Sequence, residues 1–108
     1  MSIERTLTGR ASRHVLPKGI IDTQSHIYAP DFPAMPGGPG LPIGMPDAKQ
    51  YRRLCSWLGI SKTVITVANA YQRDNDCLLH VLQKFGIDAR GVAAISPNIT
   101  DHALMDLR

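Results

Sequence analysis

Three short runs rich in β-branched and apolar residues alternate with segments of helical periodicity, and this order constrains the fold most. The runs cover residues 19–24, 62–68 and 89–96. The run 62–68 is nearly continuous in apolarity, which is typical of a strand covered on both faces, and the same is expected of 89–96. Short connections favour parallel strands with right-handed crossovers. The pattern predicts an α/β fold, either a doubly wound sheet or the opening of a (β/α) barrel.

Capping residues mark the ends of the predicted helices. Asp47 is suited to begin the first helix and Gly59 to end it. A second helix is expected at about residues 75–85 with Gly86 as its stop, and Thr100 is a suitable cap for a third. The residues spaced to face inward from the first two helices are Tyr51, Leu54, Cys55 and Leu58, followed by Leu78, Leu79, Leu82 and Phe85.

Length and charge restrict the classes of protein that fit. With 108 residues the chain forms one domain at most, and 44% hydrophobic residues suffice for a packed core. The net charge of +3 is modest and comes partly from basic residues near the N-terminus, so no nucleic-acid-binding face is expected. We expect residues 1–17 to form a loose leader and residues 18–108 to form the folded part.

The cysteines and the hydropathy pattern predict a compartment. Cys55 and Cys77 form no CxxC pair and fall within predicted helices, so we expect buried free thiols. No apolar run approaches the roughly 20 residues that a membrane-spanning helix needs, and no membrane contact is expected. Together these features predict a cytoplasmic protein.

Polar clusters follow all three predicted strands. The clusters are QSHIY at residues 24–28, NAYQRDN at residues 69–75 and SPN at residues 96–98. In parallel α/β folds, ligands bind beyond the carboxyl ends of the strands. Neither GxGxxG nor GxxxxGK[ST] occurs, which disfavours a nucleotide site. Residues 29–46, crowded with proline and glycine, form a long loop of the kind that is often functional.

His26 is the first candidate for chemistry. Strand alternation would place Asp22, Gln24 and His26 on one face. Two histidines at this spacing would bind one metal ion, but Gln24 is a poor zinc ligand, which disfavours a divalent metal at a site where it is otherwise possible. His26 then acts as a general acid or base or polarises a carbonyl, while Asp22 orients it or bonds to neighbouring backbone. The alternative is that His26 only makes a hydrogen bond in a barrel mouth.

The cluster at residues 69–75 contains a candidate for binding an anion. Arg73 is suited to hold a substrate carboxylate with two parallel N–H groups. In the alternative interpretation, Asp74 or Asn75 caps the next helix and Arg73 faces solvent. Tyr28 either leans over the same mouth or serves only in packing.

Three stretches of the chain together resemble the amidohydrolase superfamily. They are GIIDTQSHIYAPDFPAMPGGPGLP, YRRLCSWLGI and NAYQRDN, and the resemblance runs from about residue 17 to the end. The branch most similar to them contains the 2-pyrone-4,6-dicarboxylate lactonases and the D-galactarolactone isomerase type. This resemblance implies that the chain holds the first three β/α units of a (β/α)8 barrel, with the site at the carboxyl ends of the strands.

The resemblance also implies a reaction and roles for individual residues. Most superfamily members bind a metal through a His-x-His pair after the first strand; Gln24 and His26 occupy these positions here, and the lactonase branch has metal-independent members. The implied activity opens or rearranges a sugar-diacid lactone, with a small carboxylated lactone as partner and no cofactor. His26 would be the catalytic residue. The implied substrate-binding residues are Gln24, Tyr28, Asn69, Tyr71 and Arg73.

The length of the chain gives a further expectation. A barrel of this type usually takes about 250 residues, so we expect a fragment that is incomplete as a barrel and inactive alone. Its open sheet edge predicts self-association. The alternative is a non-enzymatic binding or self-associating fragment. A small doubly wound domain is disfavoured, because three strands make a thin sheet.

Overall fold

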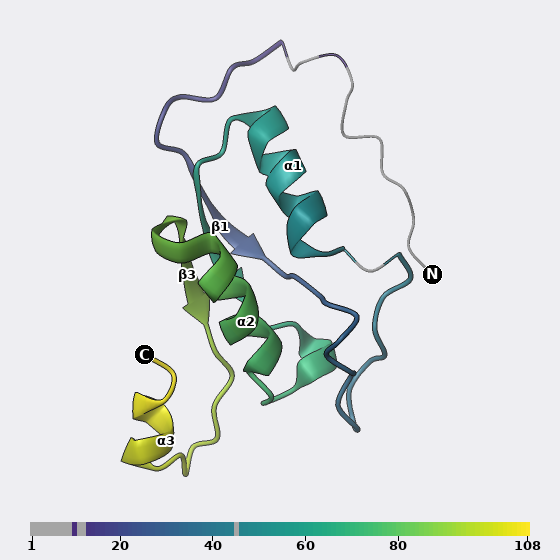
Figure 1. Cartoon of the computed structure of the whole chain (residues 1–108), viewed down its shortest axis with the longest axis vertical. Helices are drawn as coiled ribbons and strands as arrows, with labels where there is room; N and C mark the ends of the chain where they lie inside the picture. Colours follow the sequence, from purple (N-terminus) through teal and green to yellow (C-terminus); the bar gives the residue numbers. More distant parts are fainter. Residues whose placement is uncertain (1–9, 11–12, 45) are drawn as a thin grey trace.

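A computed structural model describes residues 10, 13–44 and 46–108, so most of the predicted leader lies outside the described residues. Three parallel strands form one sheet in the order β1-β2-β3. The strands are β1 (Ile21–Ser25), β2 (Lys62–Thr66) and β3 (Ala89–Val92). The helices are α1 (Ala48–Leu58), α2 (Asp76–Phe85) and α3 (Asp101–Met105), with short 3-10 turns η1 (Asn69–Tyr71) and η2 (Gly86–Asp88) (Figure 1). The predicted α/β fold with parallel strands is confirmed.

The helix boundaries follow the predicted caps. The Asp47 side chain accepts a hydrogen bond of 2.9 Å from the Gln50 N–H at the start of α1, and Gly59 ends this helix with a φ of 80°. Glycine adopts such a left-handed backbone without steric cost. Thr100 caps α3 by accepting from the Ala103 N–H at 3.1 Å. Gly86 ends α2 as predicted.

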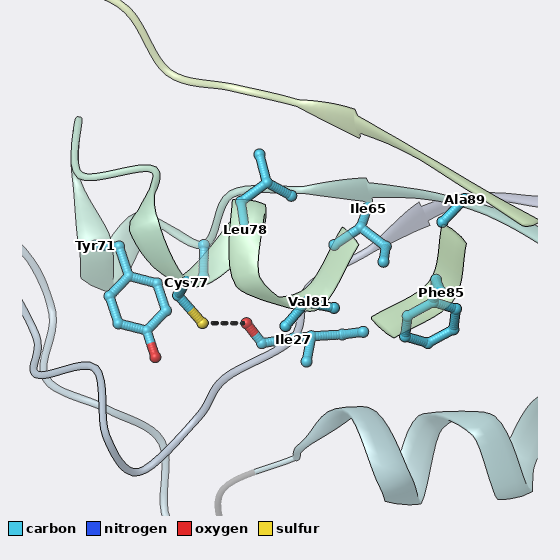
Figure 2. Close-up of a cluster of buried hydrophobic side chains, with 9 residues drawn as sticks. Ile27, Ile65, Tyr71, Cys77, Leu78, Val81, Phe85 and Ala89 are labelled. Atoms are coloured by element: carbon cyan, nitrogen blue, oxygen red, sulfur yellow. Dashed lines mark hydrogen bonds between the residues drawn. The ribbon is translucent and has the colours of Figure 1, made fainter. Parts of the chain in front are cut away.

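The core lies between the sheet and α2. Ile65 of β2 is 1% exposed and packs with Ile27, which follows β1, and with Val81 of α2 (Figure 2). Gly91 of β3 lets α2 approach closely, because a Cβ there would lie 2.6 Å from the Leu82 Cδ1. Helix α1 borders the same cluster through residues such as Tyr51, which packs against it. The core residues therefore fix the sheet against one layer of helix.

Six of the eight predicted inward-facing residues are only partly covered. Leu78 and Phe85 are buried as expected, whereas the α2 leucines at positions 79 and 82 and the apolar stripe of α1 are half-buried. Both cysteines are free; Cys77 is buried, as predicted, and Cys55 is half-buried. Within the described ranges no helix is long and apolar enough to cross a bilayer.

The prediction that strands two and three are covered on both faces is wrong. In β2, Thr63 and Ile65 are buried, but Val64 between them is only half-buried. In β3 only Ala89 is buried, and Val92 is 49% exposed. The buried positions alternate with accessible ones because helical residues pack on one face of the sheet.

The third strand is also shorter than the predicted range 89–96. It ends at Val92, and two residues later the backbone of Ala94 bonds to a side chain instead of a strand. The Asn75 Nδ2 donates to the Ala94 carbonyl at 2.9 Å, and the Ala94 N–H donates to the Asn75 Oδ1 at 3.0 Å. This pair of bonds ties the start of α2 to the segment that leaves the sheet.

Candidate functional site

Strand β1 contains a bulge just before the candidate site. Asp22 pairs with Thr63 and Ser25 pairs with Ile65, so residues 23–24 stand opposite a single residue of β2. The Gln24 N–H donates to the Asp22 Oδ1 at 3.1 Å across this irregular step. An extra residue in one strand shifts the alternation of its side chains, so residues on either side of a bulge change faces.

The bulge overturns the prediction that Asp22, Gln24 and His26 share one face. Asp22 is half-buried and accepts from the Tyr51 hydroxyl, on the face that the helices cover. Gln24 is exposed. Asp22 therefore bonds to neighbouring backbone, which is one of its two predicted alternatives. It also bonds to Tyr51 of α1.

Tyr51 organises the polar groups beneath the bulge. Its hydroxyl donates to the Asp22 Oδ2 at 2.5 Å and lies 2.8 Å from the Thr63 Oγ1. Ser25 joins the network at 3.3 Å from the same Thr63 oxygen. Burial, followed by the bond to the Asp22 carboxylate, raises the pKa of Tyr51 well above its usual range. The phenol stays protonated and remains a donor, so this cluster is structural.

His26 stands just past the end of β1 and reaches the end of β2. Its Nδ1 lies 2.9 Å from the carbonyl oxygen of Thr66, the last residue of β2. A carbonyl only accepts, so Nδ1 carries the proton, and in the neutral ring Nε2 holds a lone pair. The imidazole is exposed. It can accept a proton from a bound molecule at the carboxyl ends of two neighbouring strands.

Asn69 and Gln72 form a second polar unit after β2. The Gln72 Nε2 donates to the backbone oxygen of Asn69 at 2.6 Å and to its Oδ1 at 2.9 Å. Gln72 has a φ of 51° and is the one non-glycine residue with a positive φ in the described ranges. Such a conformation costs of order 1–3 kcal/mol and persists only where the surroundings fix it. The sequence placed Gln72 in the polar cluster but assigned it no role.

Tyr71 and Tyr28 lie in or against the core. Tyr71 is 1% exposed, and its hydroxyl accepts from the Ala29 N–H at 3.2 Å. Burial raises the pKa of Tyr71 to about 12. The Tyr28 ring packs 6.0 Å from that of Tyr71. Figure 2 shows Tyr71 beside Cys77, whose thiol reaches the Ile27 carbonyl. In this structure Tyr71 holds the loop after β1 through its hydroxyl, and the half-buried Tyr28 packs against Tyr71.

The proline- and glycine-rich loop docks on the turn after β2. The Met35 N–H donates to the Ala70 carbonyl at 2.8 Å. Gly38 lies so close that an added Cβ would stand 2.4 Å from the Gln72 Nε2 and 2.9 Å from the Asn69 oxygen. The loop is thus ordered against the Asn69–Gln72 unit.

Arg73 lines a hollow to which His26, Asn69 and Gln72 do not contribute. Its side chain is exposed, and this open hollow of about 460 Å³ lies between the start of α2, the segment after β3, and α3. Asn75 occupies the cap position of α2 without a side-chain cap bond, and Asp74 before it accepts from the Asp76 N–H at 3.0 Å. Arg73 faces solvent, as in the alternative interpretation.

The metal pair of the amidohydrolases does not fit the residues present. Of the two positions after the first strand, only His26 offers an imidazole, and Gln24 supplies an amide. In the described part of the chain, no three His, Cys, Asp or Glu side chains gather into a ligand set.

Comparison with known proteins finds homologues that are named as a lactone isomerase and a pyrone-dicarboxylate hydrolase. The chain is 46% identical over 98 residues to a D-galactarolactone isomerase of Agrobacterium fabrum, covering 90% of this chain and 34% of that protein. It is 31% identical over 94 residues to a 2-pyrone-4,6-dicarboxylate hydrolase of Comamonas testosteroni, covering 85% of this chain and 30% of that protein. The chain thus spans about a third of the length of these curated relatives. No protein-family model matches it.

Solved structures support the same relationship. An apo crystal structure from Agrobacterium tumefaciens superimposes with a TM-score of 0.81 at 44% identity, over 86% of this chain and 34% of that one. A probable 2-pyrone-4,6-dicarboxylic acid hydrolase of Acinetobacter baumannii, solved with citric acid bound, gives a TM-score of 0.74 over 81% of this chain and 33% of that one. At 16% identity, the second match supports the fold alone.

Proposed function

We propose that this chain supplies the first three β/α units of a (β/α)8 barrel in an enzyme that isomerises a sugar-diacid lactone of the galactarolactone type. The similarity to a D-galactarolactone isomerase at 46% identity supports this reaction over the hydrolysis named for the 31% identical relative. The accessible sheet face supports the barrel, because β-barrel interiors are filled by side chains from all strands. Ile21 and Val92, each 49% exposed, are available for such packing.

The observation that carries the proposal is the bond between His26 and the carbonyl of Thr66 at 2.9 Å. It orients the imidazole and leaves Nε2 as the base. In the proposed isomerisation, Nε2 takes the proton of a substrate hydroxyl while that oxygen attacks the lactone carbonyl carbon. The new C–O bond replaces the old ring C–O bond, and the proton returns to the leaving oxygen. Hydrolysis would differ only in that water is the attacking group.

The remaining groups have binding roles in this proposal. The exposed amides of Gln24 and Asn69 are proposed to contact polar groups of the substrate, and Arg73 to contact its carboxylate. Tyr28 and Tyr71 position the loop that begins at Ala29, through ring packing and the hydroxyl of Tyr71. Neither a metal nor an organic cofactor takes part in the proposed steps.

The experiment that tests this function is a chimera. Residues 17–108 replace the aligned segment of the D-galactarolactone isomerase of Agrobacterium fabrum, and the isomerisation of D-galactarolactone is followed by NMR. We expect a kcat/KM within about tenfold of the parent, since about 1.4 kcal/mol of misfit at the joins corresponds to a factor of 10. A folded chimera without isomerase activity would refute the proposal. Production of the open diacid would show that the reaction is hydrolysis and not isomerisation.

A second candidate is a self-associating fragment without catalysis. It is favoured by the two sheet edges, β1 and β3, and by the exposed apolar side chains of Ile21 and Val92. Unpaired edges and apolar patches promote pairing between chains. Sedimentation of the 108-residue chain tests this candidate: Val92→Lys should lower the association constant, and a monomer at all concentrations would rule it out.

A further inference from the structure

We propose that Gln72 is a positioning residue that turns the side-chain amide of Asn69 toward a ligand carboxylate. This inference rests on the proposed function, in which Asn69 contacts the substrate. It adds a residue that does not itself touch the substrate, and it specifies which end of the Asn69 amide is offered.

The hydrogen bonds of the unit determine what Asn69 presents. An asparagine side chain has one oxygen that accepts and one nitrogen that donates twice. The Gln72 Nε2 donates to the Asn69 Oδ1 at 2.9 Å, so the accepting end is already engaged. Within the described ranges no group accepts from the Asn69 Nδ2, and the residue is exposed. The unit therefore offers two N–H donors, which match a carboxylate.

Backbone geometry holds Gln72 in place for this task. The second bond from its Nε2, 2.6 Å to the backbone oxygen of Asn69, fixes the amide at two points. The φ of 51° at Gln72 turns the chain back so that both bonds form within one turn. An interaction that requires an unfavourable backbone is expected to serve a purpose other than stability.

Gly38 of the proline- and glycine-rich loop lies directly against this unit. A Cβ at this position would meet the Gln72 Nε2 at 2.4 Å, and the nearest backbone atom, the Asn69 oxygen, at 2.9 Å. An alanine would displace the glutamine amide or the loop. Gly40 provides a matched control, because nothing lies within 4 Å of a Cβ built there.

The first test needs no ligand. In the ¹⁵N-labelled 108-residue chain, we expect the order parameter of the Asn69 Nδ2 group to resemble rigid backbone, and to fall below about 0.6 in Gln72→Gly and Gly38→Ala. Gln72→Gly removes the amide but accepts the positive φ, so the fold is kept. Gly40→Ala should change nothing. An Asn69 amide that is mobile in the unaltered chain, or equally rigid in Gln72→Gly, would overturn the proposal.

The second test uses two lactones. D-galactaro-1,4-lactone carries a carboxylate, and D-galactono-1,4-lactone carries a hydroxymethyl group in its place. We expect the Asn69 Nδ2 signals to shift at about tenfold lower concentration of the carboxylated lactone, and this preference to disappear in Gln72→Gly. An equal response to both lactones, or to neither, would overturn carboxylate recognition.

The two proposals fail separately. An inactive chimera together with a rigid Asn69 amide that loses its order in Gln72→Gly would refute the isomerase and keep the positioning role. An active chimera whose Asn69 amide is equally ordered with and without the Gln72 side chain would keep the isomerase and refute the positioning role.

Discussion

The hydroxyl of Tyr51 on α1 donates a hydrogen bond of 2.5 Å to the carboxylate of Asp22 on β1. The same oxygen lies 2.8 Å from the Thr63 Oγ1 on β2, so one helical side chain joins two strands at the base of the bulge. The bulge in turn separates Asp22 from Gln24 and precedes His26. The position of the candidate base thus depends on a polar contact on the other face of the sheet.

Removing that hydroxyl should destabilise the chain. Tyr51→Phe leaves Asp22 and the buried Thr63 without their shared partner, and hydrogen bonds to charged groups contribute about 2 kcal/mol. We expect the free energy of unfolding, measured by urea denaturation, to fall by about this amount. Tyr28→Phe is the matched control and should change it by less than about 0.5 kcal/mol. Equal effects of the two variants would show that the contact with Asp22 contributes nothing particular.

Stability should fall in alkaline solution because of Tyr71. Its pKa is raised to about 12, whereas a tyrosine in an unfolded chain titrates near 10. Between these values the unfolded state loses a proton that the folded state keeps, so the free energy of unfolding decreases as pH rises, by up to about 1.4 kcal/mol per pH unit. Denaturant titrations from pH 9 to 12 should show a shallower slope for Tyr71→Phe. An unchanged slope would remove Tyr71 as its source.

The Asn75 side chain should be required for the segment after β3. Both of its bonds to Ala94 are lost in Asn75→Ala, and the freed backbone groups are half-buried, so we expect a loss of about 1–3 kcal/mol of stability. Asn98→Ala, at an exposed position, is the control. Hydrogen exchange should show a loss of protection first at the Ala94 amide. Full protection of that amide in Asn75→Ala would contradict the assignment.

Arg73 should affect binding without affecting stability. Its side chain is exposed, so Arg73→Ala should change the free energy of unfolding by less than about 0.5 kcal/mol. If it holds the substrate carboxylate, the chimera should show a KM raised about tenfold with an unchanged kcat. Arg53→Ala, also exposed, is the matched control. A KM unaltered by Arg73→Ala would leave this residue as a solvated side chain before α2.

Local rules predicted the elements well. Asp47, Gly59, Gly86 and Thr100 mark helix ends because caps depend on the adjacent backbone alone. The parallel pairing of the strands followed from the alternation of patterns. His26 was predicted to follow the first strand, and the structure has it just past the end of β1.

The predictions that failed concern features that depend on residues far away in the sequence. The bulge at residues 23–24 depends on β2 and on Tyr51, so an alternation rule applied to one strand could not find it. The end of β3 depends on Asn75, which lies far earlier in the chain. The burial of Tyr71 depends on the backbone of Ala29. A positive φ at Gln72 has no sequence signal, because glutamine rarely adopts it.

The most direct measurement of the central claim is the kcat of the chimera with His26→Ala. A positioned general base contributes about 10²- to 10⁴-fold, so we predict a loss in this range with D-galactarolactone, while His102→Ala, exposed on α3, keeps the activity of the unaltered chimera. An active chimera in which His26→Ala lowers kcat by less than about tenfold would contradict the account.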